Sequence, residues 1–267
     1  MRCAVLGSPI EHSLSPAMHR AAYAELGLDW TYEAIELPEG GLAAFLADRD
    51  DSWRGFSVTM PLKRELVAVA DEVSGVAAEL GVANTLVLEG GRRVASNTDV
   101  PGAAAALREA GVGTAMTARI LGGGATATSM AHALAELGVA HLELIVREPA
   151  RADGAVSAAR AAGVEVAVRR LAEPMIDVVD VLVSTVPSGI IGSRSHELVD
   201  SARAVFDVVY DPWPTTLGAA AAEHGTTFVS GLDLLAHQAA LQVRLMTGTD
   251  VPVHTLRDAA VRQLADR

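Results

Sequence analysis

The stretch ARILGGGATATSMAHALAELG, residues 118–138, places three glycines between a short apolar segment and an alanine-rich one. The apolar residues 118–121 are typical of a strand, and residues 125–137 of a helix. Gly122 to Ala127 fit the pattern G-x-G-x-x-A, in which the first glycine turns the chain, the second lets a pyrophosphate approach, and the alanine packs helix against strand. The helix amides and dipole would then face the phosphates. Many strand-to-helix turns contain glycine, but these flanking segments favour a dinucleotide site.

The alternation of strand and helix continues on both sides of this stretch. Short β-branched segments alternate with alanine-rich ones, a pattern typical of α/β folds with a mainly parallel sheet. Strands are predicted at 3–7, 31–37, 55–58, 118–121, 142–146, 164–168, 181–186, 204–209 and 227–229. Helices are predicted at 16–26, 41–48, 102–110, 125–137 and 152–162, with two more within 233–264. Residues 84–99 are predicted to form a β-hairpin.

Length and composition narrow the class of protein. A chain of 267 residues is long enough for two modest domains. It contains no apolar run near the ~20 residues of a membrane span, and its N-terminal apolar run is too short for a signal peptide. A net charge of −12 argues against non-specific binding to nucleic acid. The single cysteine, Cys3, suits a reducing compartment, so we expect a cytoplasmic protein.

The end of the next predicted strand indicates which dinucleotide would bind. Many NAD-binding chains have an acidic residue there for the ribose hydroxyls, whereas this chain has Arg147, followed by Arg151. Two guanidinium groups suit a 2′-phosphate and favour NADP. Glu148 could instead accept from a ribose or pair with Arg151, and both arginines could be solvated loop charges. Thr185, Val186 and Pro187, at the end of a later strand, would border the same crevice.

The other candidate for chemistry is Lys63, the only lysine beside twenty arginines. Arginine does not lose its proton at any useful pH, whereas lysine does when its surroundings lower its pKa. This contrast favours a role in proton transfer. The alternative is an ordinary surface lysine.

Six separated motifs resemble those of the shikimate dehydrogenase family, and the likeness extends over nearly the whole chain. In order, they are SPIEHSLSP (8–16), SVTMPLK (57–63), GVANT (81–85), SNTDVPG (96–102), DVVYDP (207–212) and GLDLLAHQA (231–239). Several motifs in one order are far more specific than a glycine loop alone.

The resemblance implies a reversible, NADP-dependent reduction of 3-dehydroshikimate to shikimate in aromatic amino acid biosynthesis. It implies a substrate-binding catalytic domain at 1–101 and 231–267, and a Rossmann-like NADP-binding domain at 102–230. Lys63 and Asp99 would be catalytic. The implied substrate ligands are Ser13, Ser15, Thr59, Asn84, Thr98, Tyr210 and Gln238. The implied cofactor ligands are Gly122, Gly123, Gly124, Ala125, Thr126, Ala127, Arg147, Arg151, Thr185, Val186, Pro187, Val208 and Gly231.

Some positions depart from the family pattern. Ser57 stands where asparagine is common, which we expect to remove one structural hydrogen bond. Gly123 and Ala125 stand where the family usually has alanine and glycine, and Val146 replaces an asparagine before the cofactor arginine. The segment GLDLL lacks a methionine often found before the glutamine.

The reaction requires a proton donor because negative charge develops on the ketone oxygen as hydride arrives. Lys63 can donate that proton, and the carboxylate of Asp99 can hold its ammonium group. Arginine could stabilise the oxyanion but not pass on the proton.

Each predicted ligand also has a purely structural interpretation. Ser13 and Ser15 could cap the helix that Pro16 opens, and Asp99 could cap the helix expected near Gly102. Asn84 could satisfy its own turn. Tyr210 could simply end a strand, and Gln238 could decorate a helix whose face it shares with Gln242.

Other classes of function receive less support. The eight histidines show no metal-binding spacing, so we expect no metal. The alternatives are a quinate/shikimate dehydrogenase that uses NAD, and a ligand-binding relative that has lost catalysis. The partner is expected to be a small molecule, with no nucleic acid or membrane, and the chain to be a monomer or homodimer.

Overall fold

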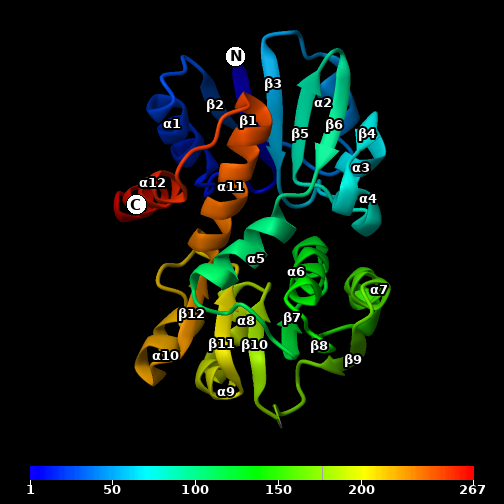
Figure 1. The fold of residues 1–267 in the computed structure, drawn as a ribbon, viewed down its shortest axis with the longest axis vertical. Coiled ribbons are helices and arrows are strands. Elements are labelled where there is room, and N and C mark those ends of the chain that lie inside the picture. The colour runs from blue at the N-terminus through cyan, green and yellow to red at the C-terminus, as the bar shows by residue number, and fades with distance from the viewer. Residues whose placement is uncertain (176) are drawn as a thin grey trace. The chain divides into compact units, whose positions relative to one another are not determined.

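The computed structural model describes residues 1–175 and 177–267 and divides into two compact units (Figure 1). Unit 1 comprises Met1–Thr98 and Leu235–Arg267, and unit 2 comprises Asp99–Leu234. The sequence placed these boundaries after residue 101 and before residue 231. They lie elsewhere because α5 (Asp99–Glu109) begins before Gly102, and because α11 (Gly231–Thr247) starts within unit 2 and continues into unit 1.

Unit 1 contains a mixed sheet of six strands in the order β2-β1-β3-β5-β6-β4. The strands are β1 (Arg2–Gly7), β2 (Thr31–Glu36), β3 (Trp53–Val58), β4 (Glu72–Val73), β5 (Thr85–Glu89) and β6 (Arg92–Ser96). β1 pairs in parallel with β2 and β3, and β4 pairs in parallel with β6. β5 is antiparallel to β3 and to β6, which confirms the predicted hairpin.

Alternation along β1 creates two cores, one on each face of this sheet. Ala4 and Leu6 join a buried cluster that includes residues of α2 (Leu42–Ala47), α3 (Glu65–Val69) and α4 (Gly75–Leu80). Cys3 and Val5 join a cluster with Tyr23 of α1 (Ser15–Glu25) and Met246 of α11. The last helix, α12 (Val253–Ala265), packs against α1. Helices therefore cover both faces of the sheet.

The α1 and α11 face of unit 1 also buries polar side chains. His19 is fully buried, its ring stacks on Tyr32 with centroids 4.0 Å apart, and its Nε2 lies 3.3 Å from Oε1 of Gln242. Burial lowers the pKa of His19 from 6.5 to about 3, although the hydrogen bond to Gln242 opposes this shift. His19 is therefore neutral in the folded protein at physiological pH.

Unit 2 contains an all-parallel sheet in the order β12-β11-β10-β7-β8-β9. The strands are β7 (Thr117–Leu121), β8 (His141–Val146), β9 (Glu165–Arg170), β10 (Val179–Ser184), β11 (Ala202–Asp207) and β12 (Thr227–Ser230). Numbered within the unit, this is the 3-2-1-4-5-6 order of dinucleotide-binding sheets. The direction of strand addition reverses between β7 and β10, where such sheets bind ligands.

The expected helices of unit 2 are present as α5, α6 (Ala125–Glu136) and α7 (Asp153–Ala161), with a 3₁₀ turn η1 (Pro149–Ala152) before α7. α5 begins three residues before the predicted start, because Pro101 is accommodated in its first turn, where no intrahelical N–H bond is lost. Besides η1, unit 2 contains four elements that were not predicted: α8 (Ser188–Ile191), η2 (Gly192–Arg194), α9 (Ser195–Asp200) and α10 (Thr216–His224). In unit 1 the sequence did not predict α3, β4 or α4.

Across the described residues, we find no helix with both the length and the apolar character that a membrane span requires.

We predict that His19 makes the protein less stable in mild acid. Below pH 6.5 the unfolded chain binds a proton at His19 while the folded chain, with a pKa of about 3, does not. Stability therefore falls as pH decreases from about 6.5 toward 3, by about 1.4 kcal/mol per pH unit. Urea unfolding of the wild type and His19→Gln at pH 7.5 and 5 should show the wild type losing about 2 kcal/mol more than the variant.

The exposed His254→Gln variant is the matched control. An equal loss of stability in the wild type and in His19→Gln would show that His19 is not the responsible group.

Candidate functional site

Lys63 lies in the turn that follows β3, and its side chain is only 8% exposed. Leu62 and Leu66, fully buried on either side, anchor this turn in the core. The amide of Ala83 donates to the carbonyl of Lys63 at 2.9 Å, which ties the turn to the segment that carries Asn84. Lys63 is therefore not the ordinary surface lysine of the alternative interpretation.

Thr59 lies at the start of the same turn, and its amide donates to the carbonyl of Leu6 at 2.9 Å. Gly7, which ends β1, has no space for a side chain, because an added Cβ would lie 2.4 Å from Cγ2 of Thr59. The close approach of the ends of β1 and β3 thus positions Thr59 and depends on glycine.

Asn84, Thr98 and Gln238, all three predicted as substrate ligands, lie together in a buried hydrogen-bonded cluster. Nδ2 of Asn84 donates to Oγ1 of Thr98 at 2.9 Å and to Oε1 of Gln238 at 3.2 Å. Oδ1 of Asn84 accepts from the Thr98 amide at 2.8 Å. Asn84 does not merely satisfy its own turn, because its partners come from distant parts of the chain. These groups offer neutral donors and acceptors suited to ring hydroxyls.

The two predicted carboxylate ligands of unit 1 lie at the start of α1. Ser15 is buried and is the first residue of the helix, and Oγ of Ser13 accepts from the Ser15 amide at 3.3 Å. Leu14 occupies the N-cap position and makes no side-chain cap. Ser13 therefore has a local structural role, which leaves a role in ligand binding as a prediction for both serines.

In unit 2 the glycine loop connects β7 directly to α6. Gly122 has a φ of +109°, and a Cβ there would lie 2.2 Å from Oγ1 of Thr185. A Cβ on Gly123 would lie 2.5 Å from the carbonyl oxygen of Arg151. Both positions therefore require glycine, for conformation and close approach. Alanine at 123, the residue usual in the family, would not fit this backbone.

Gly124 differs from its two neighbours, because a Cβ there would meet no atom within 4 Å. It occupies the N-cap position of α6, with no side-chain cap hydrogen bond. The first turn of α6 thus has no side-chain cap and has open space beside Gly124. Ala127, one turn further on, is fully buried. Ala125 and Thr126 form the first turn. This loop has the space and the donors that a pyrophosphate requires.

The remaining predicted cofactor residues end neighbouring strands of the same sheet. Thr185, Val186 and Pro187 follow β10, which ends two residues earlier than predicted, and Oγ1 of Thr185 donates to the carbonyl of Leu121 at 2.8 Å. Val208 follows β11, and its carbonyl oxygen would lie 2.4 Å from a Cβ on Gly231. These residues therefore gather at the carboxyl edge on the β10 side of the reversal point, and the glycine loop follows β7 on its other side.

Arg147 is exposed and follows β8, and Arg151 is exposed in η1. Nε of Arg151 lies 3.8 Å from a carboxylate oxygen of Glu148, and both side chains are more than 70% exposed. Such a pair contributes little to stability, so it leaves Arg151 available to a ligand.

Two predicted residues lie outside unit 1 although the other substrate and catalytic candidates lie within it. Asp99 is buried in the first turn of α5, directly after Thr98 in the chain. Tyr210 lies in the partly buried segment after β11. Their roles stay predictions.

One buried acid was not selected from the sequence. Asp207 ends β11, and burial raises the pKa of its carboxyl, opposed by hydrogen bonds from the Thr215 side chain and the Val209 amide. It could have been found as a charged residue that ends an apolar strand.

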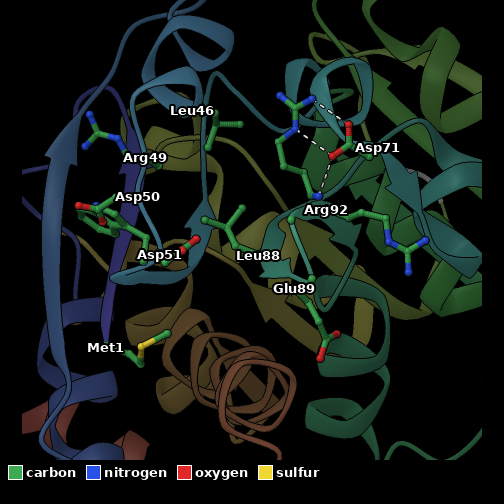
Figure 2. A pocket seen from close by; sticks show the side chains of 13 residues that line it. Met1, Leu46, Arg49, Asp50, Asp51, Asp71, Leu88, Glu89 and Arg92 are labelled. Atoms are coloured by element: carbon green, nitrogen blue, oxygen red, sulfur yellow. Dashed lines mark hydrogen bonds and ion pairs between the residues drawn. The ribbon is translucent and has the colours of Figure 1, made fainter.

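A pocket of about 400 Å³ lies at the other end of the unit 1 sheet (Figure 2). Its lining includes Met1, before β1, and Trp53, which starts β3, whereas Lys63 follows the end of β3. Two of its lining residues, Arg93 and Asp71, form an ion pair with Nη2 and Oδ1 2.8 Å apart. Its described lining includes none of the predicted site residues, so this pocket is separate from the candidate site.

Comparison with known families supports the motif analysis. Residues 5–86 match the model of the shikimate dehydrogenase substrate binding domain, and residues 231–261 match that of the shikimate 5′-dehydrogenase C-terminal domain. The shikimate dehydrogenase (NADP(+)) of Moorella thermoacetica is 36% identical, over 97% of this chain and 92% of the relative.

Solved structures agree in fold over the same length. Shikimate dehydrogenase from Mycobacterium tuberculosis superimposes with a TM-score of 0.88 at 38% identity, covering 98% of this chain and 99% of the other. The Thermus thermophilus shikimate 5-dehydrogenase in complex with NADP(H) and shikimate has a TM-score of 0.82 at 32% identity, with 98% and 99% coverage.

Relatives that bind NAD share the fold at lower identity. Quinate dehydrogenase from Corynebacterium glutamicum in complex with NAD has a TM-score of 0.88 at 27% identity, covering 98% of this chain and 99% of that one. The full-length relatives above 30% identity are shikimate dehydrogenases, and this chain therefore belongs to the NADP(+)-dependent shikimate dehydrogenase family.

Proposed function

We propose that this chain catalyses the reversible, NADP-dependent reduction of 3-dehydroshikimate to shikimate, in aromatic amino acid biosynthesis. The observation that carries this proposal is the buried Lys63, the only lysine of the chain, tied through Ala83 to the cluster of Asn84, Thr98 and Gln238. A titratable amine beside neutral carboxamide and hydroxyl groups suits a polyhydroxylated ring that carries a ketone.

Unit 1 binds the substrate. The carboxamides of Asn84 and Gln238 and the hydroxyls of Thr59 and Thr98 orient the ring hydroxyls, and the serines before α1 hold the carboxylate. Such neutral donors avoid the cost of burying a second charge beside Lys63. Tyr210 is proposed as a further substrate contact.

Lys63 donates the proton. As negative charge develops on the ketone oxygen, the ammonium group of Lys63 stabilises it and transfers a proton, which converts the ketone into an alcohol. The carboxylate of Asp99 is proposed to hold the ammonium group and to assist its reprotonation. In the reverse direction neutral Lys63 accepts the hydroxyl proton.

Unit 2 holds NADP, which when bound supplies or accepts the hydride. The uncapped amides of α6 and the open space at Gly124 accommodate the pyrophosphate. Arg147 and Arg151 are proposed to bind the 2′-phosphate, the charge that distinguishes NADP from NAD. A cytoplasmic location remains the expectation from the single cysteine.

The assay that tests this function combines shikimate or quinate with NADP⁺ or NAD⁺. We expect turnover of shikimate with NADP⁺ to exceed each of the other three combinations in kcat/KM. Preference for quinate with NAD⁺ would favour the alternative that the Corynebacterium relative represents. Thermal stabilisation by shikimate without turnover would indicate a relative that has lost catalysis.

Lys63→Met and Lys63→Arg should both lower kcat by about 10²–10⁴-fold, because neither side chain can transfer the proton. The neighbouring Arg64, which is exposed, gives the matched control Arg64→Met, which should remain active. Circular dichroism checks that the variants are folded. Full activity in Lys63→Arg would remove proton transfer from the role of this residue.

Arg147→Ala and Arg151→Ala together should raise KM for NADP⁺ at least tenfold, because charge-assisted bonds to the 2′-phosphate contribute on the order of 1.5–3 kcal/mol each. KM for NAD⁺ should change little. Arg160→Ala, at an exposed position of α7, is the control. An equal rise for both cofactors would contradict recognition of the 2′-phosphate.

A further inference from the structure

A row of polar side chains crosses the otherwise apolar face of the unit 1 sheet that α1 and α11 cover (Figure 1). Ser57 of β3 lies beside Val5 of β1 and opposite Thr85 of β5 in the strand register. Both Ser57 and Thr85 are buried. Buried hydroxyls require partners, and in this layer Gln242 of α11 supplies them.

Gln242 is 1% exposed and uses both ends of its carboxamide. Nε2 donates to the carbonyl of Asn84 at 3.2 Å and to Oγ1 of Thr85 at 3.1 Å. Oε1 accepts from the hydroxyl of Ser57 at 2.7 Å. A backbone carbonyl only accepts, so the bond to Asn84 fixes which end of Gln242 faces β5.

This orientation is transmitted to the carboxamide of Asn84. Because Oγ1 of Thr85 accepts from Gln242, its proton is directed to Oδ1 of Asn84, 3.0 Å away. With Oδ1 accepting from Thr85 and from the Thr98 amide, Nδ2 of Asn84 must face the oxygens of Thr98 and Gln238. Gln242 therefore reinforces, through Thr85, the orientation of Asn84 that the Thr98 amide also requires.

The other end of the Gln242 carboxamide, Oε1, accepts from neutral donors. The hydroxyl of Tyr32 donates to Oγ of Ser57 at 2.6 Å, which leaves the Ser57 proton for Oε1 of Gln242. Nε2 of the neutral His19, 3.3 Å from the same oxygen, completes its contacts as a donor. The chain of hydrogen bonds runs in one direction, from Tyr32 to Asn84.

We infer that Gln242 is a positioning residue for the reaction, acting on the substrate through Thr85 and Asn84 without touching it. Its link to turnover rests on the proposed function, in which Asn84 binds a ring hydroxyl. Replacing Gln242 by leucine removes the donor that directs the Thr85 proton, which loosens the hold of Thr85 on Oδ1 of Asn84. The proposed substrate ligand is then misoriented although it is still present.

The test uses the fact that the chain has only two asparagines, Asn84 and Asn97. Selective ¹⁵N labelling of asparagine gives two pairs of side-chain amide signals, assigned by their loss in Asn84→Ala. Gln242→Leu should shift the Asn84 pair and speed its exchange with solvent. The Asn97 pair should not move, because Nδ2 of Asn97 donates to the carbonyl of Val82 outside this chain of bonds. Unmoved Asn97 signals also show that the unit is folded.

The same variant is assayed for turnover. We expect KM for shikimate to rise roughly tenfold, with kcat and KM for NADP⁺ changed less than about threefold. This pattern is expected when the lost interaction stabilises the bound substrate and the transition state equally. Gln242→Leu should add no further loss in an Asn84→Ala background. Gln263→Leu, at an exposed position of α12, is the matched control. Ser57→Ala, a smaller change, should have the same effects in weaker form.

Unchanged Asn84 signals, or a full additional loss in the Asn84→Ala background, would overturn the inference. Shifted Asn84 signals in a protein that turns over no shikimate would uphold the positioning of Asn84 and reject the proposed function.

Discussion

The carboxamide of Asn84 accepts from one set of neighbours and donates to another, and it joins the separate segments of unit 1. Its partners come from Thr85 on β5, Thr98 after β6, and Gln238 on α11, which returns from the other end of the chain. Gln242 of α11 donates to the backbone carbonyl of the same residue. No single one of these segments could bury its polar group alone, because an unmade buried hydrogen bond costs about 1–3 kcal/mol. The cluster therefore links α11 to the sheet, and the same bonds preorganise the groups proposed to meet the substrate.

Unit 2 depends on a different constraint, which is steric. At Gly122 and Gly123 the chain passes so near Thr185 and Arg151 that a methyl group would clash, whereas at Gly124 a methyl group would fit. The first two glycines thus serve the packing of the loop on its own unit, and the third leaves the N-terminus of α6 open. In the sequence, a glycine needed for packing cannot be distinguished from a glycine that leaves room for a ligand. Only the positions of the neighbouring atoms in the structure distinguish these two roles.

The sequence predicted the strands, the hairpin and the longer helices well, since each combines a clear period with a turn residue. It missed β4 and the short helices α3, α4 and α8 to α10, because segments of two to nine residues carry too little periodicity. It also could not predict Arg119, which lies fully buried in β7 and is satisfied by Glu143 and Ser201, far away in sequence. In the candidate site, motifs identified the residues, but the substitution at Ser57 was expected to lose a hydrogen bond. The structure gives Ser57 two partners, Tyr32 and Gln242, which no local pattern reveals.

The distribution of charge explains why one lysine suffices. With a net charge of −12 the protein offers no general attraction to anionic ligands, so attraction must be local. In the proposed function the cofactor phosphates are met by backbone amides at α6 and by exposed arginines, which remain cationic at every working pH. In the same proposal neutral serines meet the substrate carboxylate, so that the positive charge beside the ketone is that of Lys63. On this proposal a lysine is required beside the ketone, because an arginine there could stabilise the developing charge but could not give up its proton at any working pH.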